Sequence, residues 1–272
     1  MMRRYKQSWQ GYFQDKSVWV TGASSGIGAA LVEALGAAGV RTLASARRTD
    51  RLEELERRHA SVSALSLDLA ECDLIGEVAA RAWEQLGGID ILINNAGISQ
   101  RSTFVEADPS TLERVIRVDL IGTMWLTHAV AARMKHRGNG HLVAVTSLAA
   151  MIPTPRRTAY AAAKAGLHGL FDAMRGELEP SGISISLAAP GFVRTEISTH
   201  AVTETGAEHG VLDSNQEHGD DAASCAVEIL VGVAKRRREF LVSMSPRLRI
   251  ALLLRRHAPG LLWRILAKAS VT

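Results

Sequence analysis

The 272 residues, of which 47% are hydrophobic and 22% are charged, suffice for one large α/β domain and are too apolar for a disordered chain. The net charge of +4 is unevenly distributed. Residues 235–272 hold ten Lys or Arg against one acid, Glu239, and no nucleic-acid reading motif accompanies them, so we expect no nucleic-acid partner. Cys72 and Cys225 lie far apart and no histidines have metal-ligand spacing, so we predict neither a disulfide framework nor a metal site.

The N-terminal extension, residues 1–15, is basic but has no apolar stretch long enough for a secretory signal. Elsewhere in the sequence, no uncharged apolar run approaches the ~20 residues needed to span a bilayer. We therefore expect a cytoplasmic protein.

Apolar, strand-like runs alternate with helical patterns along the chain. In chain order, the sequence predicts strand Ser17–Thr21, helix Ile27–Ala38, strand Arg41–Ala46, helix Arg51–Arg58, strand Val62–Leu67, helix Leu74–Leu86, strand Ile89–Ile93, helix Pro109–Lys135, strand His141–Thr146, helix Ala159–Glu179 and strand Ile183–Ala188. Parallel neighbours need a crossover helix between them, and fully apolar strands fit burial on both faces. The pattern predicts a single α/β domain over residues 1–272, with a doubly wound parallel sheet of about seven strands flanked by helices.

Residues 198–221 interrupt this alternation. The segment is rich in Glu, His, Gly, Thr and Ser, and it is long for a plain connection. We interpret it as a lid or substrate-binding loop; the alternative is a merely mobile connection.

A glycine-rich turn joins the first strand to the first helix, with the sequence Thr21-Gly22-Ala23-Ser24-Ser25-Gly26-Ile27-Gly28. Glycines let the backbone approach a pyrophosphate closely, and the start of a helix presents free N–H groups to it. The position between a strand and a helix is the context in which such a turn binds a dinucleotide. The spacing, T-G-x-x-x-G-x-G, resembles the short-chain dehydrogenase/reductase family, which binds NAD(P)(H) on a Rossmann-type sheet.

Three later segments resemble the same family, and each follows a predicted strand. Asp68-Leu69 matches the position that contacts adenine, Asn94-Asn95-Ala96-Gly97 matches the NNAG element, and Pro190-Gly191-Phe192-Val193-Arg194-Thr195 matches the PG segment near the nicotinamide amide. Ligands of open α/β sheets bind at these strand ends. The resemblance runs from about residue 15 to residue 197. It implies that Gly22, Ser24, Ser25, Gly26, Ile27, Gly28, Asp68, Leu69, Asn95, Ala96, Gly97, Pro190, Gly191, Val193 and Thr195 bind the cofactor.

The end of the second strand indicates which nicotinamide cofactor is used. An acidic residue there would bond the ribose hydroxyl of NAD and repel the 2′-phosphate of NADP, but Ala46 stands where NAD-preferring relatives usually carry Asp. Arg47 follows it and can grip a phosphate with paired charge-assisted bonds, with a hydroxyl from Ser24 or Ser25. The sequence predicts NADP(H), and the alternative is an NAD-dependent alcohol dehydrogenase on the same scaffold.

Ser147, Tyr160 and Lys164 are the candidate catalytic residues. Tyr160 and Lys164 are four apart on a helix and share one face. A nearby ammonium favours the phenolate and lowers the pKa of a tyrosine from about 10, so the phenol can exchange a proton with a carbonyl or alcohol oxygen. Ser147, at the end of a strand, can hydrogen-bond to the same oxygen. The resemblance implies these three roles, and it places Tyr160 and Lys164 at the cofactor as well, with Lys164 on the nicotinamide ribose.

Asp119 departs from the family pattern, because the fourth catalytic position of the family is usually Asn. In the family that residue helps to hold a water through its main-chain carbonyl, a role that Asp119 would keep. A buried carboxylate could instead change the pH profile. The substitution also leaves open a cofactor-binding sensor or scaffold with weak catalysis.

The flanks of the expected cleft are mostly apolar and favour a lipophilic ketone, aldehyde or alcohol as substrate; they include Met151, Ile152, Pro153, Phe192 and Val202. Residues 246–269 of the basic amphipathic C-terminal segment 235–272 alternate Leu, Ile and Trp263 with arginine, and Pro259-Gly260 predicts a break into two helices. This stretch suits peripheral contact with the inner membrane surface, packing on its own domain, or a subunit contact. The family resemblance implies a homodimer or homotetramer.

Overall fold

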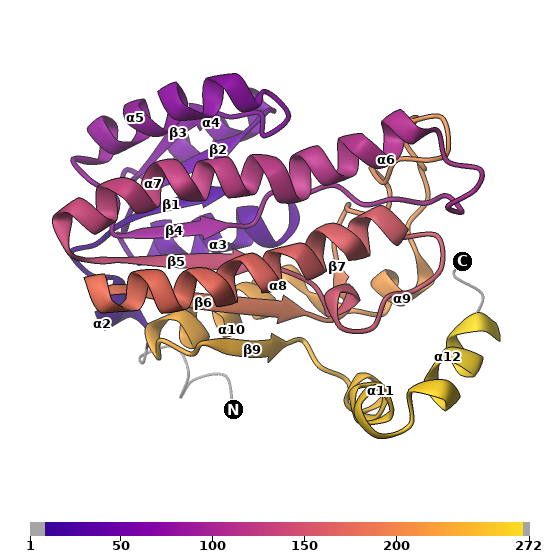
Figure 1. Ribbon diagram of the computed structural model, residues 1–272. Helices are drawn as coiled ribbons and strands as arrows, with labels where there is room; N and C mark the ends of the chain where they lie inside the picture. The colour runs from indigo at the N-terminus through magenta and orange to yellow at the C-terminus, as the bar shows by residue number, and fades with distance from the viewer. Residues whose placement is uncertain (1–8, 269–272) are drawn as a thin grey trace.

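A seven-stranded parallel sheet forms the centre of the computed structural model, which describes residues 9–268 (Figure 1). Its strand order is β3-β2-β1-β4-β5-β6-β9. The strands are β1 (Ser17–Thr21), β2 (Arg41–Ala46), β3 (Val62–Ser66), β4 (Ile91–Asn94), β5 (Gly140–Val145), β6 (Ile183–Pro190) and β9 (Glu239–Val242). Every neighbouring pair is parallel, which confirms the predicted doubly wound α/β sheet.

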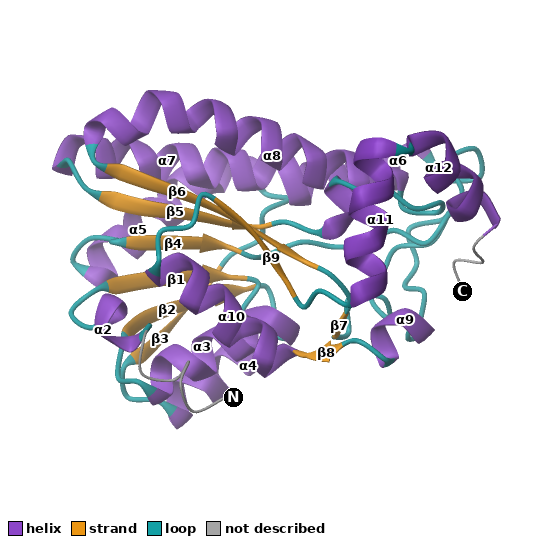
Figure 2. Ribbon diagram, turned by 90° about the horizontal axis from the view of Figure 1, so that it is seen from below, coloured by secondary structure: helices purple, strands orange, loops and turns teal. Residues whose placement is uncertain are grey.

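Helices cover both faces of this sheet (Figure 2). One face carries α3 (Gly26–Ala37), α4 (Thr49–Arg58) and α10 (Ala222–Ala234), and the other carries α5 (Ile75–Leu86), α7 (Thr123–Arg137) and α8 (Thr158–Leu178). The remaining elements are α2 (Gln10–Phe13), η1 (Cys72–Leu74), α6 (Pro109–Ile116), η2 (Arg117–Gly122), η3 (Leu148–Ala150), η4 (Glu179–Ser181), β7 (Val193–Arg194), α9 (Ser214–Glu217), β8 (Asp220–Asp221), α11 (Pro246–His257) and α12 (Pro259–Lys268).

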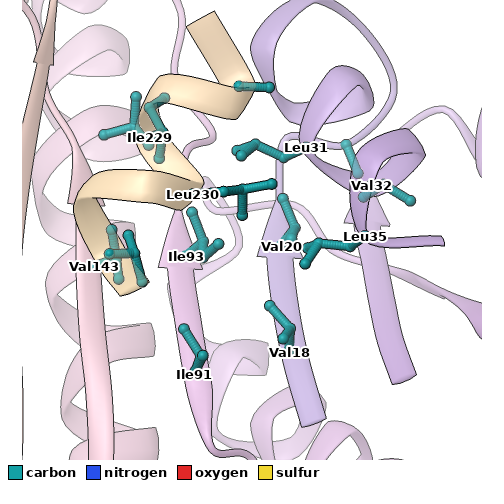
Figure 3. Packing of buried hydrophobic residues seen from close by; sticks show 14 of the residues in the cluster. Val18, Val20, Leu31, Val32, Leu35, Ile91, Ile93, Val143, Ile229 and Leu230 are labelled. Atoms are coloured by element: carbon teal, nitrogen blue, oxygen red, sulfur yellow. The ribbon is translucent and has the colours of Figure 1, made fainter. Parts of the chain in front are cut away.

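Side chains along each buried strand point alternately to the two faces of the sheet, so one sheet contributes to two hydrophobic cores. Val18 and Val20 of β1 point to the face that α3 and α10 cover, where they meet Leu31 and Leu230 (Figure 3). Trp19, between them, belongs to the opposite core with α5, α7 and α8. Because successive side chains of a strand face opposite sides, a fully apolar strand requires this two-sided cover.

The strand order reverses between β1 and β4. In open α/β sheets, ligands bind at the carboxyl ends of the two strands on either side of such a reversal. From β1 the chain winds outward to β2 and β3, and it then returns to add β4 on the other side. The loops after β1 and β4 therefore diverge at their carboxyl ends. The glycine-rich turn and the Asn94–Gly97 segment both lie at this point.

Several elements lie where the sequence analysis predicted no regular structure: α2, β7, α9, β8, α10 and β9. The seventh strand, β9, lies within the basic segment; it alternates exposed Glu239 and Leu241 with buried Phe240 and Val242. Four residues of alternating burial next to a run of Lys and Arg give too weak a strand pattern to recognise. In the N-terminal extension, α2 buries Phe13, and Trp9 just before it is buried too, both in the core beside α3.

The long helix predicted from Pro109 is interrupted at η2, a π-helical segment that separates α6 from α7. Single π turns inside helices are often found at functional sites, and Asp119 lies in this one. The stretch Pro109–Arg137 is long and apolar enough to cross a membrane by length and composition alone, but half of its apolar window is buried inside the protein. A core helix passes the same test, so this stretch is weak evidence for a membrane span.

The C-terminal segment forms two helices, α11 and α12, with the break at the predicted position before Pro259. Their inner side packs against the turn after β5: Leu262 is buried with Leu148 and Ile152, and Leu248 and Leu252 pack around them. The two helices therefore cover the protein next to Ser147.

Candidate active site

The glycine-rich turn forms a cradle in which side chains would not fit. Gly22 has φ +68°, and a Cβ there would lie 2.7 Å from Cα of Ala96. A Cβ on Gly28 would collide with the carbonyl oxygen of Gly22. Ser25, the N-cap of α3, makes no side-chain hydrogen bond to the first helical turn. The first N–H groups of α3 can therefore bind an external acceptor such as a phosphate.

A cleft runs along this turn, and twelve of the residues predicted to bind a cofactor line it: Gly22, Ser24, Ser25, Gly26, Ile27, Arg47, Asp68, Leu69, Asn95, Ala96, Gly97 and Thr195. Four others do not line it. Gly28 packs against Gly22, Pro190 is buried at the end of β6, Val193 is buried in the core, and Gly191 lies against Ser243 and Leu248. The structure thus gives Gly191 a packing role, because a side chain there would meet the C-terminal segment.

Asn95 joins the two loops at the switch point. Its side-chain amide donates to the carbonyl oxygen of Thr21 over 3.0 Å, and the backbone N–H groups of Asn95 and Ala96 each donate to Oγ1 of Thr21 over 3.1 Å. Asn94 is buried and donates to Oγ1 of Thr127 in α7. These bonds fix the backbone of the cleft before any ligand binds.

Two arginines at the end of β2 border the cleft, and only Arg47 was predicted from the sequence. Arg47 is exposed, whereas Arg48 donates from Nε and Nη2 to Oγ of Ser24 over 3.2 and 3.1 Å. Arg48 also lies 3.7 Å from a carboxylate oxygen of Glu196. The signal for Arg48 was present in the Arg47-Arg48 doublet, but the sequence alone does not show which side chain turns towards the glycine-rich turn.

Tyr160 and Lys164 are both buried on one face of α8, with 6% and 3% of their surface exposed. Nζ of Lys164 lies 5.6 Å from the centroid of the Tyr160 ring. The ring packs among Val115 of α6, Ala159 and Val202. Lys164 lies directly behind Gly97, which lines the cleft, because a Cβ added to Gly97 would lie 3.0 Å from Nζ of Lys164.

Ser147 lies at the end of β5, where it is the N-cap of η3 and its Oγ accepts from the N–H of Ala149 over 3.1 Å. Ala149 packs on the cluster that contains Tyr160. The structure therefore brings Ser147 to the same region as the Tyr–Lys pair.

The carboxylate of Asp119 contacts Lys164 directly, with 3.2 Å between Oδ2 and Nζ. Its other oxygen accepts from the N–H of Ile98 over 2.7 Å. Burial raises the pKa of Asp119, while Lys164 and the Ile98 N–H oppose that rise. Burial alone would lower the pKa of Lys164, but the charge of Asp119 outweighs it and raises the pKa, with a smaller contribution from Tyr160 when its phenol is deprotonated. We conclude that the ammonium stays charged beside the carboxylate.

The 198–221 loop borders the cleft and is tied down by a buried charge cluster that the sequence analysis missed. Asp213, 3% exposed, pairs with both Arg101 and Arg157, and Nη2 of Arg157 lies 2.6 Å from its Oδ2. Burial lowers the pKa of Arg101 to about 9. Val202 of the loop lines the cleft and also packs on Tyr160. The three partners are far apart in sequence, so no local pattern indicates their contact.

The residues present fit a dinucleotide cofactor. The glycine cradle leaves room that a Cβ would fill, the start of α3 offers N–H groups, and the arginines border the same cleft. Within residues 9–268, no group of three or more His, Cys, Asp or Glu side chains could hold a metal ion.

Comparison with known sequences gives one family. Residues 16–206 match the family described as short chain dehydrogenase. The chain is 34% identical over 271 residues to Dehydrogenase/reductase SDR family member 7B of Bos taurus. The alignment covers 96% of this chain and 83% of the relative. The chain is also 32% identical over 273 residues to the SDR family protein 7-like of Drosophila melanogaster, in an alignment that covers 97% of this chain and 83% of the relative.

Solved structures share the fold. A short-chain dehydrogenase from Streptomyces avermitilis has a TM-score of 0.77 at 26% identity, over 94% of this chain and 98% of that one. A metagenomic short-chain oxidoreductase in complex with NADP has a TM-score of 0.69 at 28% identity, over 84% and 96% of the two chains. A Burkholderia phymatum enzyme in complex with NAD, 23% identical, has a TM-score of 0.80 over 92% and 96%, a likeness of fold alone.

Proposed function

The chain belongs to the short-chain dehydrogenase family of oxidoreductases, and on that premise we propose that it uses NADP(H) to interconvert a ketone or aldehyde and an alcohol. The observation that carries the proposal is the position of Lys164. Its Nζ lies against Gly97, which lines the cleft, and 5.6 Å from the Tyr160 ring centroid. This position next to a cleft residue supports the assignment of Tyr160 and Lys164 as the proton-transfer groups beside a bound dinucleotide.

Three side chains act on the substrate oxygen in this proposal. A nicotinamide cofactor, when bound, supplies or accepts the hydride at the carbon. Tyr160 gives its phenolic proton to the carbonyl oxygen during reduction, and in the reverse direction its phenolate takes the proton of the alcohol. Ser147 donates a hydrogen bond to the same oxygen. Lys164 holds positive charge beside the phenol.

The preference for NADP(H) rests on the end of β2. Ala46 leaves that strand without a carboxylate, and Arg47 and Arg48 follow it along the cleft. A guanidinium pairs well with a 2′-phosphate. The contact between Arg48 and Ser24 supports this preference, because it holds a guanidinium directly beside the glycine-rich turn.

A lipophilic substrate is favoured by the apolar cluster next to Ser147. Leu148 and Ile152 of the turn after β5 pack with Leu262 of α12, and Met151 lies beside them. Of the apolar residues predicted to flank the cleft, Val202 lines it and packs on Tyr160, and an apolar contact there contributes binding energy to a lipophilic carbonyl compound.

The test is NADPH oxidation at neutral pH with a panel of carbonyl compounds of increasing chain length and ring size, each paired with NADH. We expect turnover with NADPH on the larger ketones. Tyr160→Phe should lower kcat by roughly 10²-fold or more while NADPH binding stays unchanged. NADPH binding without turnover of any carbonyl compound would contradict the proposal and favour a cofactor-binding sensor or scaffold. Better turnover with NADH would favour the NAD-dependent alternative.

The outer side of α11 and α12 is the surface that we propose contacts an anionic lipid bilayer. Ile250, Leu253, Leu261 and Ile265 are exposed there at 49–60%. Exposed arginines stand among them, and the sequence has no acid after Glu239; the arginines are Arg247, Arg249, Arg255, Arg256 and Arg264. Apolar side chains interleaved with cations are complementary to the acyl boundary and the headgroups of anionic lipid.

A further inference from the structure

We propose that Asp119 is a positioning residue that keeps Tyr160 a proton donor and so sets the upper pH limit of carbonyl reduction. The inference rests on the proposed function for its consequence, but its electrostatic part concerns only residues of this chain. It starts from the ion pair between Asp119 and Lys164, with 3.2 Å between Oδ2 and Nζ.

The fold buries this ion pair and holds it in place. Asp119 is 0% exposed, and its second oxygen accepts from the N–H of Ile98 over 2.7 Å. The carboxylate comes from the π-helical segment η2, which interrupts the helix at this point. Gly97 lies against the pair, because a Cβ there would be 2.8 Å from Oδ2 of Asp119 and 3.0 Å from Nζ of Lys164. Any side chain at residue 97 would displace one of the two charged groups.

The carboxylate changes the charge that Tyr160 experiences. A lone ammonium beside a tyrosine favours the phenolate and lowers the pKa of the phenol. Here a carboxylate lies beside the same ammonium, so the pair acts on Tyr160 as a dipole with no net charge. In a site with Asn at residue 119, the full positive charge of Lys164 would remain.

Lys164 is the cation that lies over the Tyr160 ring. The apolar neighbours of the ring are Val115 of α6, Ala149 of the turn after β5 and Val202 of the 198–221 loop. Arg157, just before α8, also acts on Tyr160 electrostatically, and it shares the carboxylate of Asp213 with Arg101. A substitution of Asp119 leaves this arginine cluster unchanged, so a comparison with the wild type isolates the effect of Asp119 on Tyr160.

The chemical consequence concerns the acid step. Reduction adds a hydride to the carbonyl carbon and a proton to its oxygen, and Tyr160 supplies that proton and is reprotonated from water. Reduction fails at high pH once the phenol has lost its proton. A phenol beside an ammonium that is paired with a carboxylate stays protonated to higher pH than one beside an unpaired ammonium, so reduction extends further into the alkaline range.

The experiment is a pH titration of tyrosinate absorbance in the cofactor-free protein. The chain has three tyrosines, so the difference between the wild type and Tyr160→Phe isolates the signal of Tyr160. Asp119→Asn is the matched variant, because the amide has the same shape and can still accept from Ile98. We expect the Tyr160 midpoint to fall by about one pH unit or more in Asp119→Asn, measured against Asp119→Asn/Tyr160→Phe. An unchanged or higher midpoint would overturn the inference.

The pH dependence of carbonyl reduction gives a second test. With a substrate in hand, the alkaline limb of kcat/KM for reduction should move by the same amount in Asp119→Asn. If the midpoint shifts but no carbonyl compound is reduced, the proposed function fails and the inference on Asp119 stands. If reduction occurs with an unshifted midpoint, only the inference fails.

Discussion

Arg157 donates to Asp213 over 2.6 Å, and this contact ties the helix that carries Tyr160 to the loop that borders the cleft. Arg101, which follows the Asn94–Gly97 segment, pairs with the same carboxylate. One buried acid thus joins three segments around the site. Because the Tyr160 ring packs on Val202 of this loop, the cluster also fixes one wall of the tyrosine pocket.

Asp213→Ala should destabilise the protein strongly. The change leaves two buried guanidinium groups without their carboxylate, and breaking a buried ion pair costs about 3 kcal/mol or more in free energy of unfolding. Denaturant titration measures this loss. Glu217→Ala is the matched control, an exposed acid of the same loop, for which we expect about 0.5 kcal/mol or less. Equal losses for the two variants would show that the cluster does not hold the loop.

Reversing the charge at Arg47 or Arg48 should weaken NADPH binding. An acid at either position would repel the 2′-phosphate and remove a charge-assisted bond worth about 1.5–3 kcal/mol, so we expect the Kd for NADPH to rise roughly tenfold or more in Arg47→Asp and in Arg48→Asp. The Kd for NADH should change little. Fluorescence titration of the nicotinamide measures both constants. Arg51→Asp, on the exposed side of α4, serves as the control. Unchanged NADPH affinity in Arg47→Asp and in Arg48→Asp would show that neither arginine binds the 2′-phosphate.

Much of this arrangement could be predicted from the sequence, because the pattern that carries it is local. Buried strands and their crossover helices follow from apolar runs, and Tyr160 and Lys164 share a face through their spacing on one helix. The pairing of Asp119 with Lys164 could not be predicted, because it depends on how the π turn η2 packs against α8. The same holds for Arg101, Arg157 and Asp213, which are brought together only by the folded loop. Distant charge pairs leave no periodic pattern in a sequence.

Leu253→Glu and Ile265→Glu together should abolish binding to anionic vesicles. Both side chains are exposed on the outer side of α11 and α12, and an added acid removes apolar area and opposes the anionic headgroups. Vesicle co-sedimentation with and without phosphatidylserine measures the effect. Val105→Glu is the control, because Val105 is 91% exposed but lies outside the two helices. If the wild type binds no vesicles and forms oligomers that the double variant loses, the surface is a subunit contact.

The protein should lose stability between about pH 6.5 and pH 3 through His141. This ring is 1% exposed in β5, with the Tyr12 hydroxyl 2.9 Å from Nδ1 and the Ser186 hydroxyl 2.8 Å from Nε2. Burial, assisted by Arg236 and Lys16, lowers the pKa of His141 to about 3. In the unfolded chain the imidazole titrates near 6.5, so in this window the unfolded state binds more protons than the folded state.

The free energy of unfolding must therefore fall as the pH drops through that window, with a contribution of up to about 1.4 kcal/mol per pH unit. Above about pH 6.5 both states hold a neutral ring, and His141 adds no pH dependence. Denaturant titrations of the wild type and His141→Gln at several pH values give the difference in slope, in which the contribution of the carboxylates cancels. His136→Gln, an exposed histidine at the end of α7, should keep the wild-type slope. A His141→Gln curve parallel to the wild type would mean that His141 binds its proton equally well in the folded and unfolded states.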